Sequence, residues 1–336
     1  MNIRESMEKM EKQVLSPYAA CSIDSLGRDH YEEECDVRTV YQRDRDRILH
    51  CKAFRRLKDK TQVFLAPQGD HYRNRLTHTL EVSQIARTIA KALRLNGDLV
   101  EAIALGHDLG HTPFGHAGER ALNHVCPEGF AHYKQSVRVV EVLEKNGEGL
   151  NLTKEVRDGI LNHRTAAHPS TLEGQVVRYS DKIAYIHHDM DDAQRANIIT
   201  EDDIPITLRM LLGFTTRERL NTFVHDIIEN SLDRDEICMS AEIEEALRDL
   251  RAIMFRNVYE NPVAKKEEGK AVEMLENLYY YYNDHPQNMS REYRELIEIR
   301  GEPKSRVVCD YLSGMTDQYS MEKFREIYIP RAWEVY

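Results

Sequence analysis

Apolar residues recur at spacings of three and four along most of the chain, which is the pattern of helices with one buried face. The clearest example runs from Leu76 to Leu93. His78 lies four residues before the apolar Val82, so its side chain is expected to point with the buried face. Because segments that alternate strictly between apolar and polar residues are scarce, the pattern predicts an all-α fold.

A second periodic segment covers about residues 98–110. In it His107 follows Ile103 by four residues, and Asp108 follows Ala104 by the same interval. Side chains four residues apart lie on one face of a helix. We therefore expect His107 and Asp108 to project inward together.

The next helix is predicted to begin at Thr112, with the threonine as N-cap and Pro113 at the first helical position. On this helix His116 and Glu119 are three residues apart. Their side chains are therefore close enough to meet.

The longest predicted helix covers residues 174–196. On it Asp181 shares a face with Val177 and Tyr185, and Asp189 lies at the edge of that face. Other helices are expected over 132–146, after the N-cap Thr153, after Thr215, whose spacing to Glu218 is that of a capping box, and after Ser240.

No internal repeat, low-complexity tract or Gly/Ser linker divides the 336 residues. A chain of this length can bury a substantial core. We therefore expect one compact all-α unit over residues 1–336.

The charge of the chain is acidic, with 46 Lys and Arg against 57 Asp and Glu and a formal net charge of −11. This balance disfavours nonspecific binding to nucleic acid as the main function, although local basic pockets are compatible with it.

The six cysteines are scattered, without a C-x-x-C pair, which is typical of reduced thiols in the cytoplasm. No apolar run approaches the roughly 18 residues of a membrane span, and the charged N-terminus lacks the apolar segment of a secretory signal. A cytoplasmic protein without a membrane partner is the expectation.

The stretch ALGHDLGHTPFGHAGE, residues 104–119, places three histidines, an aspartate and a glutamate among apolar residues. Each polar group that is buried without a hydrogen-bond partner destabilises the fold by about a few kcal/mol. This stretch must therefore remain accessible to solvent or hold a ligand that binds its polar groups. We interpret it as a site for a metal ion and a phosphate.

Three inward-facing segments together offer two imidazoles and two carboxylates: His78, the pair His107 and Asp108, and Asp181. This set suits Mn, Fe, Co, Ni or Zn and lacks the thiolates of structural zinc sites. A hydrogen-bonded core histidine would also explain His78, and Asp181 could pair with Arg178. Spacing alone does not choose between these interpretations.

Five segments of the sequence resemble the HD-domain deoxynucleoside triphosphate triphosphohydrolases, the dGTPase-like family. They are FRRLKDKTQVF (54–64), RLTHTLE (75–81), GHDLGHTPFGHAGE (106–119), SDKIAYIHHDMDD (180–192) and, more loosely, RVVCDYLSGMTDQY (306–319).

The resemblance implies an HD-domain helical fold with additional C-terminal helices. We expect an HD-type catalytic core over residues 35–200, with a helical extension over residues 201–336 packed on it.

The resemblance also implies one divalent metal ion, Mn, Fe, Ni, Co, Zn or Mg, held by His78, His107, Asp108 and Asp181. In such enzymes water attacks the α-phosphorus of a dNTP and releases deoxynucleoside and intact triphosphate. Additional Mg could accompany the substrate triphosphate.

By the same resemblance His116 is the candidate acid that protonates the leaving group, and Glu119 orients its imidazole. His132 falls where related sequences carry a second histidine that faces the phosphates. His111 is expected in the same phosphate region, with a purely structural hydrogen bond as the alternative.

The remaining carried-over residues would contact the substrate. Arg75 and Lys182 match phosphate-contacting positions, and Tyr185 would crowd the position of a 2′-hydroxyl. Asp189 would accept a hydrogen bond from the 3′-hydroxyl, and Gln62 resembles a sugar contact.

A homo-oligomer, a hexamer or a tetramer, is expected from the family resemblance. Two other functions remain open at this point. One is another HD phosphohydrolase, such as a nucleotidase or a cyclic-nucleotide phosphodiesterase; the other is a non-catalytic dNTP-binding sensor.

Overall fold

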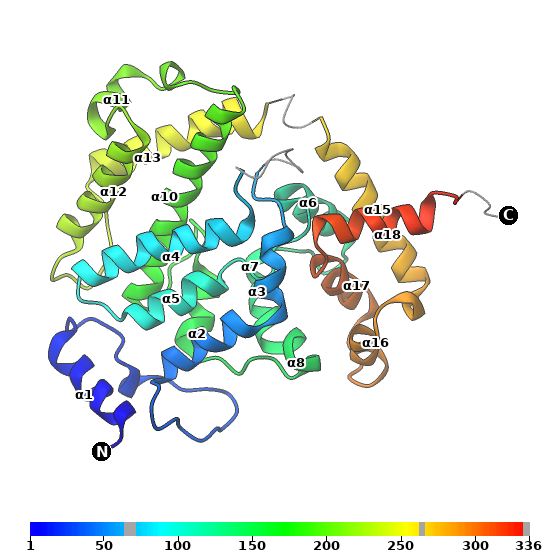
Figure 1. Ribbon diagram of the computed structural model, residues 1–336, viewed down its shortest axis with the longest axis horizontal. Coiled ribbons are helices and arrows are strands. Elements are labelled where there is room, and N and C mark those ends of the chain that lie inside the picture. The colour runs from blue at the N-terminus through cyan, green and yellow to red at the C-terminus, as the bar shows by residue number, and fades with distance from the viewer. Residues whose placement is uncertain (64–71, 262–265, 332–336) are drawn as a thin grey trace, which may run out of the picture.

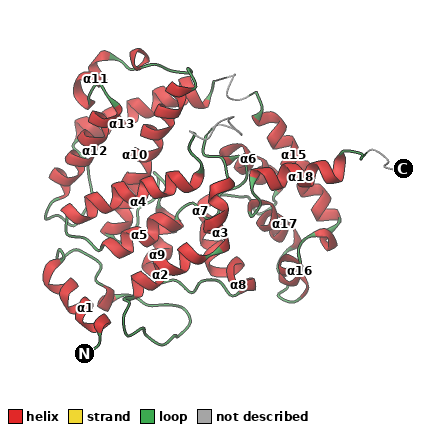
Figure 2. Ribbon diagram, in the orientation of Figure 1, coloured by secondary structure: helices red, strands yellow, loops and turns green. Residues whose placement is uncertain are grey.

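The computed structural model describes residues 1–63, 72–261 and 266–331. Within these ranges the regular secondary structure is helical, with no strand; Thr61 and Asn74 form an isolated antiparallel bridge (Figure 2). The all-α fold class predicted from the hydrophobic pattern is confirmed. No helix of the described ranges combines the length and the apolar character needed to cross a bilayer.

Four helices form the centre of the larger group of helices, on the left in Figure 1. They are α2 (Val40–His50), α4 (Arg75–Ala92), α5 (Gly97–Gly106) and α10 (Leu172–Arg195). Helix α4 packs against both α5 and α10, and α2 packs against α5. The segments predicted to carry His78 and Asp181 are therefore neighbours in space.

The other helices surround this centre. At the N-terminus lies α1 (Ile3–Val14), and α3 (Lys52–Arg56) follows α2. Between α5 and α10 lie α6 (Gly115–Val125), α7 (His132–Arg138), the π-helical turn η3 (Val139–Leu143), α8 (Glu144–Gly147) and α9 (Lys154–Asn162). After α10 come α11 (Ile206–Leu212), α12 (Thr216–Ser231), α13 (Ala241–Met254), η5 (Phe255–Tyr259), α15 (Glu268–Asp284), α16 (Arg291–Glu298), α17 (Lys304–Ser313) and α18 (Asp317–Tyr328).

Polar caps fix where several helices begin. The side chain of Asn74 accepts a hydrogen bond from the Thr77 backbone in a capping box, so α4 begins at Arg75, one turn before His78. The predicted N-caps Thr215 and Ser240 are confirmed for α12 and α13.

The prediction of one helix through residues 98–110 is wrong at its C-terminal end, because α5 ends at Gly106. The hydroxyl of Ser136 on α7 accepts from the Gly110 amide at 2.9 Å and donates to the His107 carbonyl at 2.7 Å. Those backbone groups would otherwise have bonded within the helix. His107 and Asp108 consequently lie in the turn that follows α5.

The predicted helix start at Thr112 is also wrong. Helix α6 begins at Gly115, and its N-cap is Phe114, whose φ of 60° lies in the left-handed region. This conformation costs a residue with a side chain about 1–2 kcal/mol. The turn buries the Phe114 ring in a hydrophobic cluster, which offsets part of that cost.

The buried apolar residues form two clusters. The first cluster fills the space between α2, α4, α5, α9 and α10 and extends to α12 and α13. The second cluster joins α6 to α15 and α17, on the right in Figure 1. Residues 107–114, which carry the candidate site residues His107, Asp108 and His111, connect α5 of the first cluster to α6.

Glu173, in the first turn of α10, is a buried carboxyl that ties the N-terminal segment to the first cluster. Its Oε1 accepts hydrogen bonds from the Ala20 amide at 3.0 Å and the Asn96 amide at 2.9 Å. Burial raises the pKa of Glu173 from 4.5 to about 7.

Glu173→Gln should therefore alter how stability depends on pH. Since the folded-state pKa lies above the unfolded value, the wild-type protein loses stability as pH rises between them, by about 3 kcal/mol in total. Glutamine cannot ionise, so the stability of the variant relative to wild type should rise between about pH 5 and about pH 8. Urea unfolding at both pH values measures this change. A wild-type-to-variant difference that is the same at both would contradict the prediction.

Candidate metal centre and active site

Four ionisable side chains from three segments converge in the structure. His78 comes from α4, His107 and Asp108 from the turn after α5, and Asp181 from α10. The Nε2 atom of His78 lies 3.1 Å from Asp181 Oδ1, and Nε2 of His107 lies 3.8 Å from the same oxygen. His107 Nε2 is also 3.5 Å from Asp108 Oδ2. The fold thus brings together residues that are as much as 103 positions apart.

The backbone orients one of the two imidazoles for coordination. Nδ1 of His107 donates a hydrogen bond to the Ala104 carbonyl at 2.7 Å, since a carbonyl can only accept. In the neutral ring Nε2 then carries a lone pair. This atom is buried and has no hydrogen-bond partner among the described residues. A ring whose Nδ1–H is held by a backbone carbonyl while Nε2 stays unpartnered is typical of a metal-ligating histidine.

The spacing of the donor atoms fits a divalent cation. Ligand atoms of His78, His107 and Asp108 lie within 4.8 Å of one another. An ion bound about 2.0–2.2 Å from each donor would separate neighbouring donors by roughly 3–4 Å. Asp181, which is partly exposed, leaves an open side to the cluster.

Both carboxylates of the cluster are anionic at neutral pH. Burial alone would raise the pKa of Asp181, but the hydrogen bond with His78 and the nearby His107 lower it to about 2. Burial likewise opposes ionisation of Asp108, yet His107 and Arg75 hold its pKa well below the usual value. The cluster therefore attracts positive charge.

Arg75 supplies one such charge. Its guanidinium is buried and donates to Asp108 Oδ2 at 2.5 Å. The same group donates to the Thr61 carbonyl through Nε and Nη2, each at 3.3 Å. Arg75 therefore links the segment before α4 to the carboxylate of Asp108.

A pair of titratable side chains, His132 and Glu119, lies beside the cluster. Nδ1 of His132, the first residue of α7, is 2.9 Å from Glu119 Oε2, and the His132 amide donates to Glu119 Oε1 at 2.9 Å. Burial disfavours the imidazolium, but Glu119 raises the pKa of His132 above its usual value. His116, by contrast, is 3.6 Å from Glu119, and its side chain is 70% exposed.

His111 connects the two groups. Its ring stacks on His132 with centroids 4.5 Å apart and meets His116 edge-on at 5.6 Å. Burial and the charge of Arg75 hold the pKa of His111 well below its usual value, so its ring is neutral.

Comparison with known proteins decides the family. The HD domain family matches residues 75–186, and the phosphohydrolase-associated domain family matches residues 237–326. The chain is 58% identical over 333 residues to a deoxyguanosinetriphosphate triphosphohydrolase-like protein of Caldanaerobacter subterraneus subsp. tengcongensis, covering 99% of this chain and 98% of the relative. It is 49% identical over 340 residues to a protein of the same name from Clostridium perfringens strain 13, covering 98% and 99%.

The chain belongs to the deoxyguanosinetriphosphate triphosphohydrolase-like family. It is an HD-domain phosphohydrolase of this dGTPase-like family, and the family resemblance stated from the sequence is confirmed. The buried His/Asp cluster is consistent with the metal site of an HD domain. A crystal structure of a hypothetical protein from Aquifex aeolicus aligns with a TM-score of 0.47 and 19% identity, covering 84% of this chain and 69% of that chain.

Two residues near the cluster of this HD-domain protein were missed by sequence reasoning. The Tyr259 hydroxyl donates to Asp189 Oδ2, although 70 residues separate the two. The His163 ring lies 5.0 Å from that of His107 and 5.4 Å from that of His132. Like His107, His163 gives Nδ1–H to a carbonyl three residues earlier. Its position at the end of a predicted helix was the one local signal available.

Two of the predicted sugar-contacting residues, Tyr185 and Asp189, lie on α10, and the third, Gln62, lies in the segment before α4. Burial raises the pKa of Asp189 to about 7, and burial also raises the pKa of Tyr185. The side-chain oxygen of Gln62 is buried. The backbone carbonyl of Gln62 accepts a hydrogen bond from the Arg75 guanidinium at 3.4 Å. Lys182 Nζ lies 5.2 Å from the centre of the Tyr179 ring, and the charge of Asp181 also acts on it.

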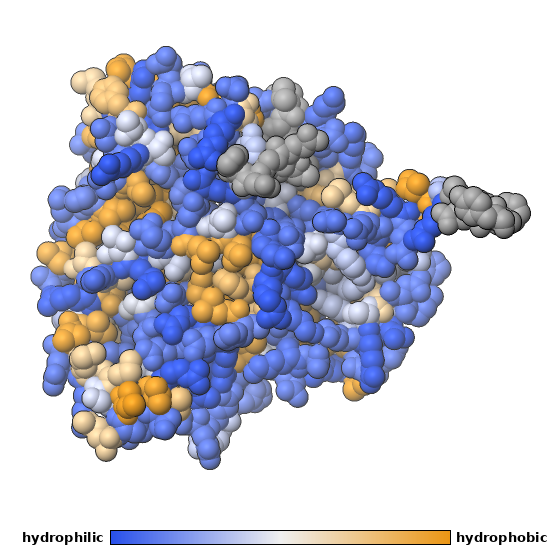
Figure 3. All heavy atoms as spheres, in the orientation of Figure 1, coloured by the Kyte–Doolittle hydropathy of each residue, from blue (hydrophilic) through white to orange (hydrophobic). Residues whose placement is uncertain are grey.

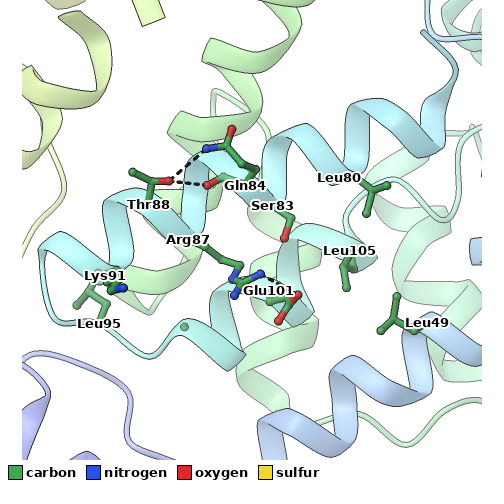
Figure 4. Close-up of a pocket in the computed structure, with 11 residues that line it drawn as sticks. Leu49, Leu80, Ser83, Gln84, Arg87, Thr88, Lys91, Leu95, Glu101 and Leu105 are labelled. Carbon is green, nitrogen blue, oxygen red and sulfur yellow. Dashed lines mark hydrogen bonds and ion pairs between the residues drawn. The ribbon is translucent and has the colours of Figure 1, made fainter. Parts of the chain in front are cut away.

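A surface groove of about 600 Å³ lies elsewhere on α4 (Figure 4). Leu49, Leu80 and Leu105 line it, and Arg87 and Glu101 form an ion pair at 3.4 Å beside them. At about 100° per residue these α4 positions fall on the opposite side of the helix from His78. Figure 3 shows hydrophobic atoms gathered on this face over α4 and α5. We assign the chemistry to the His/Asp cluster, because no histidine or aspartate lines this groove.

Asp181→Asn should lower metal binding, because it removes one anionic donor while it keeps the size of the side chain. We expect the affinity for Mn²⁺ to fall by at least about 10-fold. Asp191→Asn is the matched control on the same helix, since Asp191 pairs with Arg73 and Arg195 instead. Metal content after dialysis, measured by mass spectrometry, gives the comparison. Equal metal content in the two variants would remove Asp181 from the ligand set.

Proposed function

We propose that the protein hydrolyses deoxynucleoside triphosphates, dGTP or other dNTPs, to a deoxynucleoside and inorganic triphosphate. The relatives from Caldanaerobacter and Clostridium are named as deoxyguanosinetriphosphate triphosphohydrolase-like proteins, which supports this reaction class. The observation that supports the proposal most strongly is the ion pair between His132 and Glu119. The His111 ring stacks on His132 and thereby connects this pair to the His/Asp cluster. A protein that only senses dNTPs has little use for a proton donor there.

In this proposal His78, His107, Asp108 and Asp181 are the protein ligands of one divalent cation, with Mn, Fe, Ni, Co, Zn or Mg suited to the donors. When bound, such a cation polarises a phosphoryl oxygen and lowers the pKa of a water from about 15.7 toward 7. An additional Mg²⁺ would enter with the triphosphate.

Hydrolysis joins the water oxygen to the α-phosphorus and breaks the bond from phosphorus to O5′. The leaving alkoxide is a poor leaving group, so it needs a proton. We assign this proton to His132: Glu119 faces Nδ1, stabilises the imidazolium and leaves Nε2 free to donate. His116, which the resemblance favoured as the acid, would act from the exposed side as a contact to the triphosphate.

The other assignments concern substrate binding. A triphosphate brings about four negative charges, which a guanidinium or ammonium group can neutralise. Arg75 and Lys182 are assigned to the phosphates as cations, and the neutral His111 is assigned to them as a hydrogen-bond donor. Tyr185, Asp189 and Gln62 are assigned to the sugar. Oδ1 of Asp189 has no hydrogen-bond partner among the described residues, so it is available to accept a hydrogen bond from a 3′-hydroxyl.

The homo-oligomer, a hexamer or a tetramer, rests on the family resemblance alone. Light scattering of the purified chain tests it. Specific contact with nucleic acid has no support from the net charge of −11.

Incubation of the purified protein with each dNTP, singly and mixed, should release deoxynucleoside and intact triphosphate when Mn²⁺ is present. Chromatography of the products measures both. Orthophosphate released from a nucleoside monophosphate would favour a nucleotidase, and ring opening of a cyclic nucleotide would favour a phosphodiesterase. Thermal stabilisation by dNTPs without turnover would favour a sensor.

His132→Gln should lower kcat by about 10²–10⁴-fold, because general acid catalysis contributes on that scale. His116→Gln should lower it less, since the His116 side chain is exposed and farther from Glu119. Metal content should stay at the wild-type level in both variants. Steady-state kinetics with the preferred dNTP provide the measurement, and an undiminished kcat in His132→Gln would exclude this residue as the acid.

A further inference from the structure

The carboxylate of Asp317 lies outside the HD match of residues 75–186 but inside the phosphohydrolase-associated match of residues 237–326. It is the first residue of α18, with 9% of its surface exposed. Although α18 belongs to the second half of the chain, this carboxylate accepts hydrogen bonds from two segments beside the His/Asp cluster.

One oxygen holds the segment before α4. Oδ2 of Asp317 accepts from the Thr61 amide at 3.0 Å and from the Thr61 hydroxyl at 2.5 Å. The Thr61 carbonyl in turn accepts from the Arg75 guanidinium, which donates to Asp108 at 2.5 Å. A chain of three contacts therefore runs from Asp317 to a carboxylate of the proposed metal site.

The other oxygen holds the turn that starts α6. Oδ1 of Asp317 accepts from the Phe114 amide at 2.9 Å. Phe114 is in the left-handed conformation that residues with a side chain rarely adopt, so this turn needs an external partner to persist. Helix α6 then presents Glu119, which binds His132.

The two held segments touch each other. A Cβ atom added to Gly115 would lie 3.2 Å from the Gln62 carbonyl and 3.5 Å from Arg75 Nη2, so there is no room for the turn to shift toward them. The buried Lys60 ammonium adds a parallel link, since it donates to the His111 carbonyl at 2.5 Å and the Ser313 carbonyl at 2.7 Å.

We propose that Asp317 is a positioning residue for the active site: by bonding Thr61 and Phe114 at once, it sets the Glu119–His132 pair against the Arg75–Asp108 pair. It touches neither substrate nor metal in this role. The proposal rests on the proposed function for its kinetic readout.

Asp317→Asn tests this role, because an amide keeps one acceptor but places an NH₂ donor against a second donor. We expect kcat for the preferred dNTP to fall by at least about 10-fold, with metal content unchanged. Glu155→Gln is the matched control. Glu155 is also a buried carboxyl that accepts from a backbone amide and a hydroxyl, those of Leu26 and Ser25, at the N-terminal segment. Its kcat should equal that of wild type.

A second pair of variants covers the case in which Asp317→Asn does not fold. Thr61→Val removes the hydroxyl donor and keeps the shape, whereas Thr61→Ser keeps the hydroxyl. We expect Thr61→Val to lower kcat in the same direction and Thr61→Ser to retain it. A purely structural role would lower the melting temperature of Thr61→Val without this split in kcat.

A readout that needs no turnover separates this proposal from the proposed function. Histidine NMR of the full chain, with the His132 signal assigned through His132→Gln, reports the pKa of His132. It should fall toward its ordinary value in Asp317→Asn and stay unchanged in Glu155→Gln. If the wild-type protein releases no triphosphate but this shift occurs, the proposed function fails and the positioning role stands. Wild-type kcat and an unshifted His132 in a folded Asp317→Asn would overturn the positioning role.

Discussion

Several ionisable groups are buried at one point of the fold, where α4, α10 and the turn after α5 meet. Asp108 and Asp181 are both anionic and lie beside two imidazoles in a region largely shielded from water. Such an arrangement is costly unless charges and lone pairs find partners. Arg75 compensates one carboxylate. Within the described chain, Nε2 of His107 has no hydrogen-bond partner, and Asp181 is partly exposed. A cation could therefore enter the cluster and bind both residues.

The helices meet this constraint by dividing the site between two hydrophobic clusters. The helices of the first cluster carry His78 and Asp181, whereas α6, which carries Glu119, packs in the second cluster. Glu119 therefore reaches His132 of α7 only where the segments that join the clusters hold α6 in place. The left-handed Phe114 and the shared carboxylate of Asp317 lie at that junction. The proposed positioning role would account for the burial of Asp317 at this junction.

Local sequence patterns predicted the helices of the fold well but not their ends. Periodicity located α4 and α10, because each has one continuous buried face. It placed His107 inside a helix, since the contact of Ser136 that ends α5 comes from another element. Periodicity also could not reveal Tyr259 or His163, whose partners are distant in sequence. The roles of the candidate site residues came from the family resemblance and, like the division near residue 200, stay predictions.

We propose that His78, His107, Asp108 and Asp181 together hold one cation. A crystal structure of the protein grown with Mn²⁺, with anomalous diffraction recorded for manganese, tests it most directly. We expect one anomalous peak about 2.0–2.3 Å from Nε2 of both histidines and from an oxygen of each aspartate. A peak at another site, or none while Arg75 remains the partner of Asp108, would contradict it.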